Sequence, residues 1–244
     1  IKDCVFYQNK ICKLCYQYSA SRGGAIYLKY GTSFRLINTE FLENTGSQYG
    51  GAISVHVRGI STFNISMSKC IFGYNQAFAK GGAISISGID NLIIKSSRFS
   101  QNRASRLGGG IYLEAYSLIL INIKFDNNSA MRYGGAVYSA QLLTSLPRLD
   151  SAHIINCTFR FNAAKQRKGG GIYFNENKVL HLILTTFESN KGFSGGAIYL
   201  EEFHFDIETH YGTLIIILCK FINNEADSKG AGAFIDGKNS AHVY

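Results

Sequence analysis

Long hydrophobic runs are missing from this chain. The longest, LIIIL at residues 214–218, is far shorter than the roughly 20 apolar residues of a membrane-spanning helix, so we expect no transmembrane segment. The first residues, IKDCVFYQN, include no initiator Met, basic stretch or cleavage site, and no targeting signal is readable there. They look like the middle of a repeat, which predicts that residues 1–244 form a single repeat array and a fragment of a longer chain.

Familiar enzyme signatures are missing as well. The sequence holds no G-x-S-x-G, Walker or H-E-x-x-H motif, and its 16 acidic residues are scattered except in one segment. Nothing predicts a cofactor, and we expect none. Proline occurs once, at Pro147, and 17% of the residues are charged against 46% hydrophobic, a composition that excludes a disordered chain.

Two short motifs recur along the whole chain in a fixed order. Phe-x-x-Asn occurs eight times, from Phe6/Asn9 to Phe221/Asn224, and the copies start 26 to 35 residues apart. From the second copy onward, a small-residue doublet such as Gly134-Gly135 follows five to seven residues after the Asn. A period of this length and regularity predicts a solenoid rather than two globular domains.

The periodicity within one copy indicates the type of solenoid. Apolar residues alternate with others after each doublet, as at Ile84 and Ile86, and again before each Phe, as at Leu92 and Ile94. A period of two is typical of a strand with one buried face, and no helical period persists. The leucine-rich alternative would need an L-x-x-L-x-L core, which is absent. We therefore predict an all-β, right-handed parallel β-helix solenoid of eight rungs, about 38 Å long, with stacked Asn side chains and glycines at a bend.

The paired motifs resemble the repeats of the chlamydial polymorphic outer-membrane proteins (Pmp-type). The stretches CTFRFNAAKQRKGGGIYF at 157–174 and CIFGYNQAFAKGGAISI at 70–86 carry this resemblance, which extends over nearly the whole chain. It implies a right-handed β-helix displayed outside a cell, with an adhesive or structural use. The membrane-anchoring barrel of that family has no counterpart in this sequence.

Four cysteines share one predicted inward position, two residues before the Phe: Cys4, Cys70, Cys157 and Cys219. They fall on rungs that are not neighbours, so we expect buried free thiols rather than disulfides. Cys12 and Cys15 form a lone C-x-x-C, for which a local disulfide or two free thiols is favoured over a metal site.

Cations gather just before the doublets of a chain with a net charge of +9. We assign six of them to one predicted basic row along the rod: Arg22, Lys80, Arg106, Arg132, Lys168 and Lys229. Like charges in a row repel, so the row predicts an anionic partner, either an acidic polysaccharide or an acidic protein surface. No module specific for nucleic acid is visible. The alternative is a solvated turn of a basic protein.

Tyrosines follow the apolar residue after the doublet on four consecutive rungs: Tyr112, Tyr138, Tyr173 and Tyr199. Strand alternation points them outward, and an exposed Tyr ladder would suit stacking on sugars or anchoring a protein partner. The alternative is a surface ladder that simply stiffens the sheet.

Acidic residues and histidines alternate with other residues in EEFHFDIETHY at 201–211. Glu202, His204 and Asp206 would bind a metal only if this segment curled, and a strand with one wet face is the simpler interpretation.

Three functions are consistent with these features. The leading hypothesis is a non-enzymatic extracellular or cell-surface module that is structural or adhesive, with protein partners or self-assembly and with acidic glycans as candidate ligands. The second is a lyase or hydrolase acting on acidic polysaccharide through residues 201–210. The third is a filament subunit.

Overall fold

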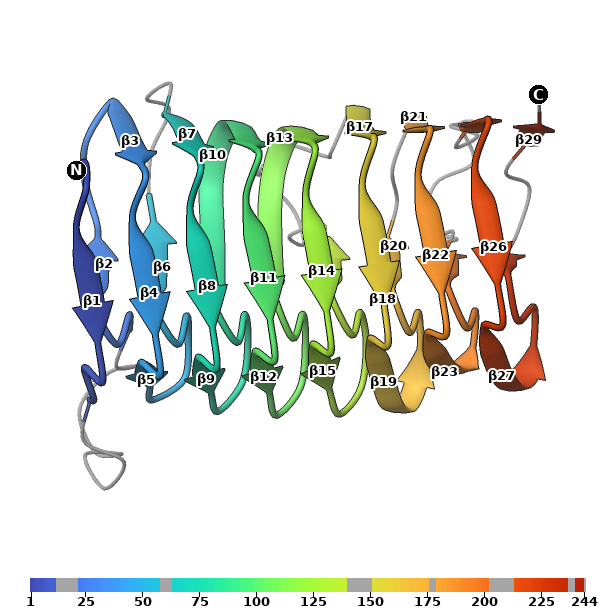
Figure 1. Ribbon diagram of the computed structural model, residues 1–244, viewed down its shortest axis with the longest axis horizontal. Coiled ribbons are helices and arrows are strands. Elements are labelled where there is room, and N and C mark those ends of the chain that lie inside the picture. Colours follow the sequence, from blue (N-terminus) through green and yellow to red (C-terminus); the bar gives the residue numbers. More distant parts are fainter. Residues whose placement is uncertain are drawn as a thin grey trace, which may run out of the picture.

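The eight copies of the repeat form the eight rungs of a parallel β-helix in the computed structural model (Figure 1). The structure describes residues 1–11, 22–57, 63–139, 151–175, 179–201, 213–236 and 240–243. Every strand pair within them is parallel and joins equivalent residues of neighbouring rungs, as Phe99 pairs with Phe72 and Phe125. The rungs thus stack in register, and the predicted β-helix is confirmed.

One wall, which we name the Phe sheet, holds the strands that carry the repeated Phe. Its eight strands are β1 (Val5–Tyr7), β4 (Glu40–Leu42), β8 (Ile71–Gly73), β11 (Arg98–Ser100), β14 (Lys124–Asp126), β18 (Thr158–Arg160), β22 (Thr186–Glu188) and β26 (Lys220–Ile222).

A second wall, the short-strand sheet, follows the repeated Asn. Its seven strands are β5 (Thr45–Gly46), β9 (Gln76–Ala77), β12 (Arg103–Ala104), β15 (Ser129–Ala130), β19 (Ala163–Lys168), β23 (Lys191–Ser194) and β27 (Glu225–Lys229).

The third wall is a sheet of 14 strands, here the large sheet, with two strand positions in most rungs. The strands after the doublets are β2 (Ile26–Leu28), β6 (Ile53–His56), β16 (Val137–Ser139), β20 (Ile172–Asn175), β24 (Ile198–Glu201) and β28 (Ala233–Ile235). Those before the Phe sheet are β3 (Ser33–Ile37), β7 (Asn64–Ser68), β17 (Ser151–Ile155), β21 (Val179–Ile183), β25 (Thr213–Ile217) and β29 (Ser240–Val243). In rungs three and four, β10 (Ile84–Lys95) and β13 (Ile111–Ile121) run through both positions, so these two rungs carry no insertion.

The core is a single apolar column enclosed by the three walls. Inward residues of the large sheet, such as Ile84 and Leu118, are wholly buried. The repeated Phe rings stack face to face along the column, with centroids 4.7 to 5.1 Å apart from Phe6 to Phe221. Burial of a large side chain on every rung supplies the main favourable free energy, because it removes apolar area from water.

The predicted Asn ladder is confirmed, and its hydrogen bonding is complete. Asn102 donates its backbone N–H and its Nδ2 to Oδ1 of Asn128, at 3.1 and 2.9 Å. Its Nδ2 also donates to the carbonyl of Phe72 on the preceding rung, at 2.9 Å. The same pattern continues to Asn162, so these amides are buried without an unmet hydrogen bond.

Two separate physical constraints explain why the doublet consists of glycines. The first glycine adopts a positive φ, for example +65° at Gly81, which costs glycine little and other residues more. A Cβ on the second, Gly82, would lie 2.1 Å from the carbonyl oxygen of Gly109 on the next rung. The doublet therefore marks a bend, as predicted, and also a close approach of the backbones of two neighbouring rungs.

Two further corners of each rung use a left-handed backbone at residues other than glycine. One precedes the inward Cys position, as at Asn156 with φ +50°, and the other precedes the repeated Asn, as at Phe161 with φ +53°. The side chains at these corners vary from Asn and Ser to Leu, Tyr and Phe. Such residues rarely adopt this conformation, so their recurrence reflects the constraint that stacking places on the rung.

The four cysteines of the inward position are free thiols, as predicted. Cys70 and Cys157 are buried, whereas Cys4 and Cys219 on the first and last rungs are only partly so. Burial raises the pKa of the Cys157 thiol to about 12, which keeps it protonated. Cys12 and Cys15 lie outside the described residues.

Candidate functional site

The predicted basic row needs a correction, because its six residues do not share one register position. The residues that stack directly before the doublets are Arg22, Tyr49, Lys80, Leu107 and Tyr133 on the first five rungs. Arg106 and Arg132 lie one residue earlier, and the backbone N–H of Arg132 donates to the carbonyl of Arg106 at 3.0 Å. They therefore form a separate pair on the turn. The prediction grouped these six cations because each lies close to a glycine doublet. It did not separate the residues directly before the first glycine from those one position earlier.

Two members of the predicted row already have acidic partners. Nζ of Lys168 lies 2.6 Å from Oε1 of Glu201 and 4.4 Å from the centre of the Tyr199 ring. Nζ of Lys80 donates to the hydroxyl of Tyr112 at 2.6 Å and lies 3.8 Å from Oε1 of Glu114. Their charges are neutralised in place, which leaves little for an outside anion.

The other two members pack against aromatic rings. The guanidinium of Arg22 lies 5.1 Å from the ring centre of Tyr49, and Nζ of Lys229 lies 5.3 Å from that of Phe234. Cation–π contacts of this kind hold a cation against the wall without cancelling its charge.

The Tyr ladder exists, but the prediction that it is exposed was wrong. The rings of Tyr112, Tyr138, Tyr173 and Tyr199 stack with centroids 4.9 to 5.6 Å apart. Tyr112, Tyr173 and Tyr199 are each only 2 to 3% exposed. Stacking occupies the flat faces of these rings, so a sugar ring cannot pack on them.

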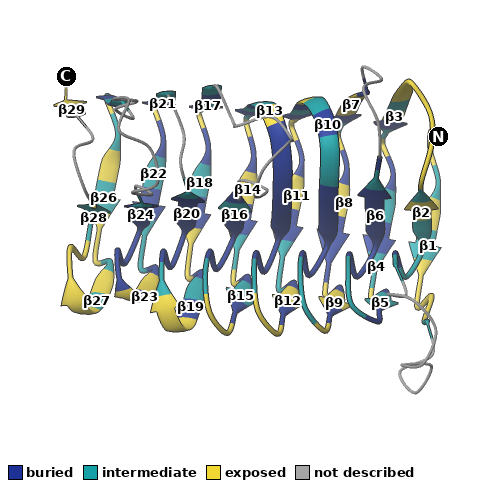
Figure 2. Ribbon diagram, turned by 180° about the vertical axis from the view of Figure 1, so that it is seen from behind, coloured by how far each residue is buried: buried dark blue, intermediate teal, exposed yellow. Residues whose placement is uncertain are grey.

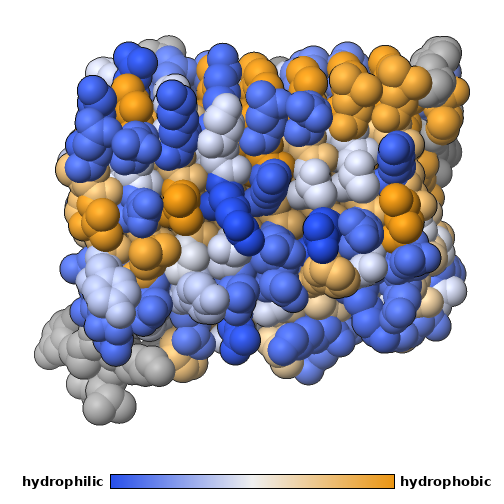
Figure 3. All heavy atoms as spheres, viewed as in Figure 1, coloured by the Kyte–Doolittle hydropathy of each residue, from blue (hydrophilic) through white to orange (hydrophobic). Residues whose placement is uncertain are grey.

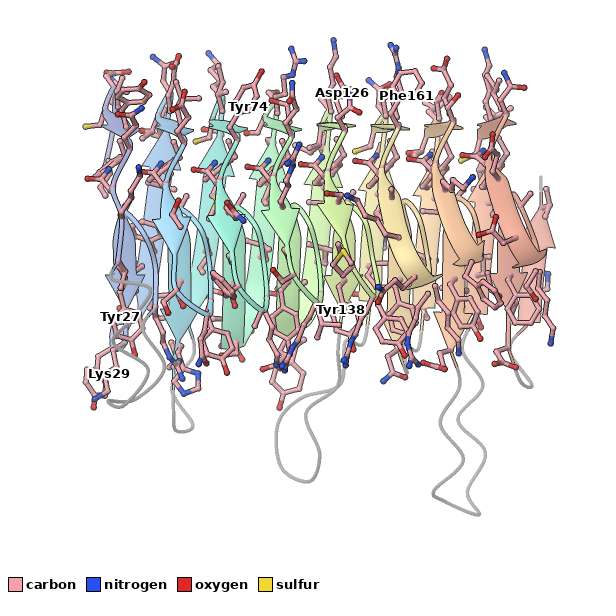
Figure 4. All side chains as sticks on the ribbon, turned by 90° about the horizontal axis from the view of Figure 1, so that it is seen from below. Tyr27, Lys29, Tyr74, Asp126, Tyr138 and Phe161 are labelled. Atoms are coloured by element: carbon pink, nitrogen blue, oxygen red, sulfur yellow. The ribbon has the colours of Figure 1, made fainter. Side chains whose placement is uncertain are left out.

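The pictures place this ladder on one wall of the rod. Figure 4 shows Tyr138 and Tyr27 on one side, opposite Tyr74 and Phe161. From behind, the strands that carry the ladder, β13, β16, β20 and β24, are largely dark blue in Figure 2. Tyr27 is 43% exposed and has no stacked neighbour, since Ser54 and Ser85 occupy this position on rungs two and three.

A polar network that the sequence analysis missed lies beside the ladder on the third and fourth rungs. The hydroxyl of Tyr112 accepts a hydrogen bond from Lys80 and donates one to Glu114, two residues along the same strand. Glu114 is 8% exposed. Its position could have been found from the period of two, because residues 112 and 114 share one face of β13.

Burial perturbs the titration of all three groups in this network. Desolvation raises the pKa of the Glu114 carboxyl, although hydrogen bonds from Tyr112 and Lys80 oppose the shift. Desolvation likewise lowers the pKa of Lys80 and raises that of Tyr112. Such a cluster is able to hold and transfer a proton, and perturbed groups of this kind are common at functional sites.

The acidic and histidine segment cannot be assessed in the same way. Glu202, His204 and Asp206 lie outside the described residues, as does the rest of 202–212. In the described part of the chain, no three His, Cys, Asp or Glu residues are grouped so as to hold a metal ion.

The family follows from comparison with known sequences. Residues 25–244 match the family described as the right-handed β-helix region. The chain belongs to the right-handed β-helix family. No curated protein and no solved structure matched this β-helix. The family match covers the fold and its handedness, and the finer resemblance to Pmp-type repeats stays a prediction. The described residues of this β-helix include no helix with the length and apolar character needed to cross a membrane.

Proposed function

We propose that this β-helix is a non-enzymatic module displayed outside the cell or at the cell surface, where it acts as a structural or adhesive element. The observation that carries this proposal is the unbroken stacking of Asn and Phe side chains through all eight rungs. Every rung is tied to the next by the same amide and the same ring, and both are buried on the inner rungs, which favours a stiff rod. A stiff rod suits a spacer, an assembly subunit or a platform for binding a partner.

The location is supported by the resemblance to Pmp-type repeats, which implies display outside a cell. Intact cells that produce the chain should bind an antibody raised against the folded protein, and external protease should remove the signal without lysis. Release of a cytosolic protein during the same protease treatment is measured as the control, because it would show that the cells leak. Labelling that appears only after lysis would contradict the proposal.

An enzyme acting on acidic polysaccharide is the alternative, and the network of Lys80, Tyr112 and Glu114 favours it. A buried carboxyl with a raised pKa beside a lysine with a lowered one resembles an acid–base pair. Our proposal assigns the network a structural role, because its groups bond to one another and Tyr112 is buried in the ladder.

Turnover assays separate the two functions. The protein is incubated with polygalacturonate, alginate and a sulfated glycan, and new reducing ends and unsaturated uronates are measured. We expect no turnover by the native protein. Turnover that is lost in Glu114→Gln but kept in Lys168→Gln would replace our proposal with the enzymatic one, since Lys168 belongs to a separate ion pair.

A further inference from the structure

The short-strand sheet and the turns that follow it carry an unusual concentration of exposed cations. On rungs four, five and six, five cationic side chains are exposed, and we name them the cation patch: Arg103, Arg106, Arg132, Lys165 and Arg167. The three segments that hold them, 102–108, 128–134 and 162–169, contain no Asp or Glu. Figure 1 places β12, β15 and β19 side by side along the lower edge of the rod.

The members of the patch lie close together because the rungs stack in register. Arg132 is hydrogen-bonded through its backbone to Arg106, at 3.0 Å. Arg103 precedes Arg106 by three residues on the same rung, and the chain bends between them, so their backbones lie at most about 10 Å apart. The backbone N–H of Gln166 donates to the carbonyl of Met131 at 2.9 Å, which places Lys165 and Arg167 beside Arg132.

The cations of the patch have no acidic partner in the part of the chain that the structure describes. Within the described residues, no carboxylate lies within ion-pair distance of any of the five. Cations elsewhere on this protein are often paired, as Arg98 is with Asp126 at 3.3 Å and Arg160 with Glu188 at 3.4 Å. The charge of Arg106 is also felt nearby, because it contributes to lowering the pKa of Lys80. An unpaired cluster on a rigid support costs free energy in self-repulsion that a bound anion relieves.

We propose that the cation patch binds a linear acidic polysaccharide that lies along the axis of the rod. The inference rests on the proposed adhesive function and names its ligand class. Guanidinium groups form paired hydrogen bonds with carboxylate and sulfate groups, and rung stacking sets Arg132 next to Arg106 along the axis of the rod. Met131, 36% exposed within the patch, and Phe193, 50% exposed on the seventh rung, offer apolar contacts to the carbon faces of sugar rings.

Nucleic acid and membranes fit the patch less well. Single-stranded nucleic acid needs several free aromatic faces in succession, on which consecutive bases stack, and one exposed ring such as Phe193 does not supply them. The Tyr133 ring beside the patch is instead packed 4.9 Å from Tyr173, and its hydroxyl accepts a hydrogen bond from Arg167. A membrane surface needs a continuous apolar face, whereas Met131 and Phe193 lie two rungs apart with cations between them.

The test compares two triple variants with the same change in net charge. Arg103→Glu/Arg106→Glu/Arg132→Glu reverses the patch, and Lys69→Glu/Lys95→Glu/Lys124→Glu reverses three exposed lysines outside it. Unfolding temperature and circular dichroism confirm that both variants keep the fold. Binding to heparin and to polygalacturonate is measured by calorimetry at low and at physiological salt.

We expect the patch variant to lose affinity for at least one of the two polysaccharides by about tenfold or more, with a flatter salt dependence. The control variant should lose less than about threefold. Equal losses in both variants, or binding to neither polysaccharide by the native chain, would overturn the inference and leave the surface-module proposal standing. Tighter binding to single-stranded DNA or to anionic vesicles than to both polysaccharides would also overturn it. Cleavage of the bound polysaccharide would instead contradict the proposed function.

Discussion

Oδ1 of Asn128 accepts two hydrogen bonds from Asn102, one from its backbone N–H at 3.1 Å and one from Nδ2 at 2.9 Å. Nδ2 of Asn128 in turn donates to Oδ1 of Asn162 and to the carbonyl of Phe99. All four residues are buried. Asn128 is therefore a link whose loss leaves polar groups unsatisfied on both neighbouring rungs, which makes the ladder a sensitive test of the fold.

Asn128→Ala should lower the free energy of unfolding by at least about 3 kcal/mol, since each buried group left unpaired costs about 1–3 kcal/mol. Urea denaturation followed by circular dichroism measures the change. Asn91→Ala is the matched control, because Asn91 is exposed and its Nδ2 donates to Oδ1 of Asn64 at the surface. A similar loss in both variants would show that the ladder does not stabilise the rod.

The ladders were predictable because each repeats one residue type at one place. The repeated Phe, Asn and glycine each have the same structural role at the same place on every rung. Their recurrence along the chain was therefore enough to predict that they stack. The left-handed corners were not predicted, because residues as different as Asn156 and Leu184 occupy them. The neighbouring rungs impose the positive φ at these corners, so the residue type there does not indicate the backbone conformation.

The candidate site was harder to predict than the fold. A period of two gives the direction in which Tyr112 points, but not whether stacked neighbours cover it. The pairing of Lys168 with Glu201 depends on side-chain reach between adjacent rungs, which no single copy of the repeat contains. The sequence does show that Arg106 lies outside the row of Lys80. Lys80 directly precedes the first glycine of its doublet, whereas one residue separates Arg106 from the first glycine of the next doublet.

Leu184 should be replaceable with a gain in stability. It adopts a φ of +52° and is 52% exposed, while Asn156 occupies the same corner on the preceding rung. Nδ2 of Asn156 donates to Oδ1 of Asn122 at 2.7 Å, so Leu184→Asn can extend a surface amide row. Because Asn tolerates the left-handed region better, we expect a gain of about 1 kcal/mol in the free energy of unfolding.

The control for this substitution has ordinary backbone geometry. Ile222→Asn changes a 40% exposed residue of β26, where Asn is a poor strand former, and should be neutral or destabilising. A loss of stability in Leu184→Asn would show that the apolar contacts of Leu184 outweigh its backbone strain. Figure 3 shows hydrophobic residues gathered at the upper right of the molecule, on the side of Figure 1 where β21 is labelled.

Two buried hydroxyls should respond in opposite directions when removed. Among the residues that the structure describes, Oγ of Ser139 is buried without a hydrogen-bond partner, in a row whose neighbours are Leu113 and Phe174. Ser139→Ala should therefore stabilise the protein by about 1 kcal/mol. Thr185 donates its hydroxyl to the carbonyl of Ile183 at 3.0 Å, and Thr185→Val should destabilise by about 1 kcal/mol or more. Thermal and urea unfolding of both variants measure these two changes in stability. A loss of stability in Ser139→Ala would show that the hydroxyl of Ser139 makes a stabilising hydrogen bond after all.

Acid should weaken the protein through the histidines of β17 and β21. The rings of His153 and His181 lie 4.7 Å apart, and burial together with His181 lowers the pKa of His153 from 6.5. The unfolded chain then binds a proton more readily than the native one. The stability contribution is complete above about pH 6.5 and decreases as the pH falls. The raised pKa of Glu114 acts with the opposite sign, so a comparison of variants is needed.

His181→Gln isolates the histidine effect, because Glu114 is unchanged in it. We expect the loss of stability between about pH 7.5 and about pH 5.5 to be smaller in this variant than in the native protein. His242→Gln is the matched control, since Ile215 separates residue 242 from His181 in the same row. If His181→Gln and the native protein lose equal stability over this range, the two imidazoles, which meet edge to face, do not interact, and the acid response has its origin elsewhere in the chain.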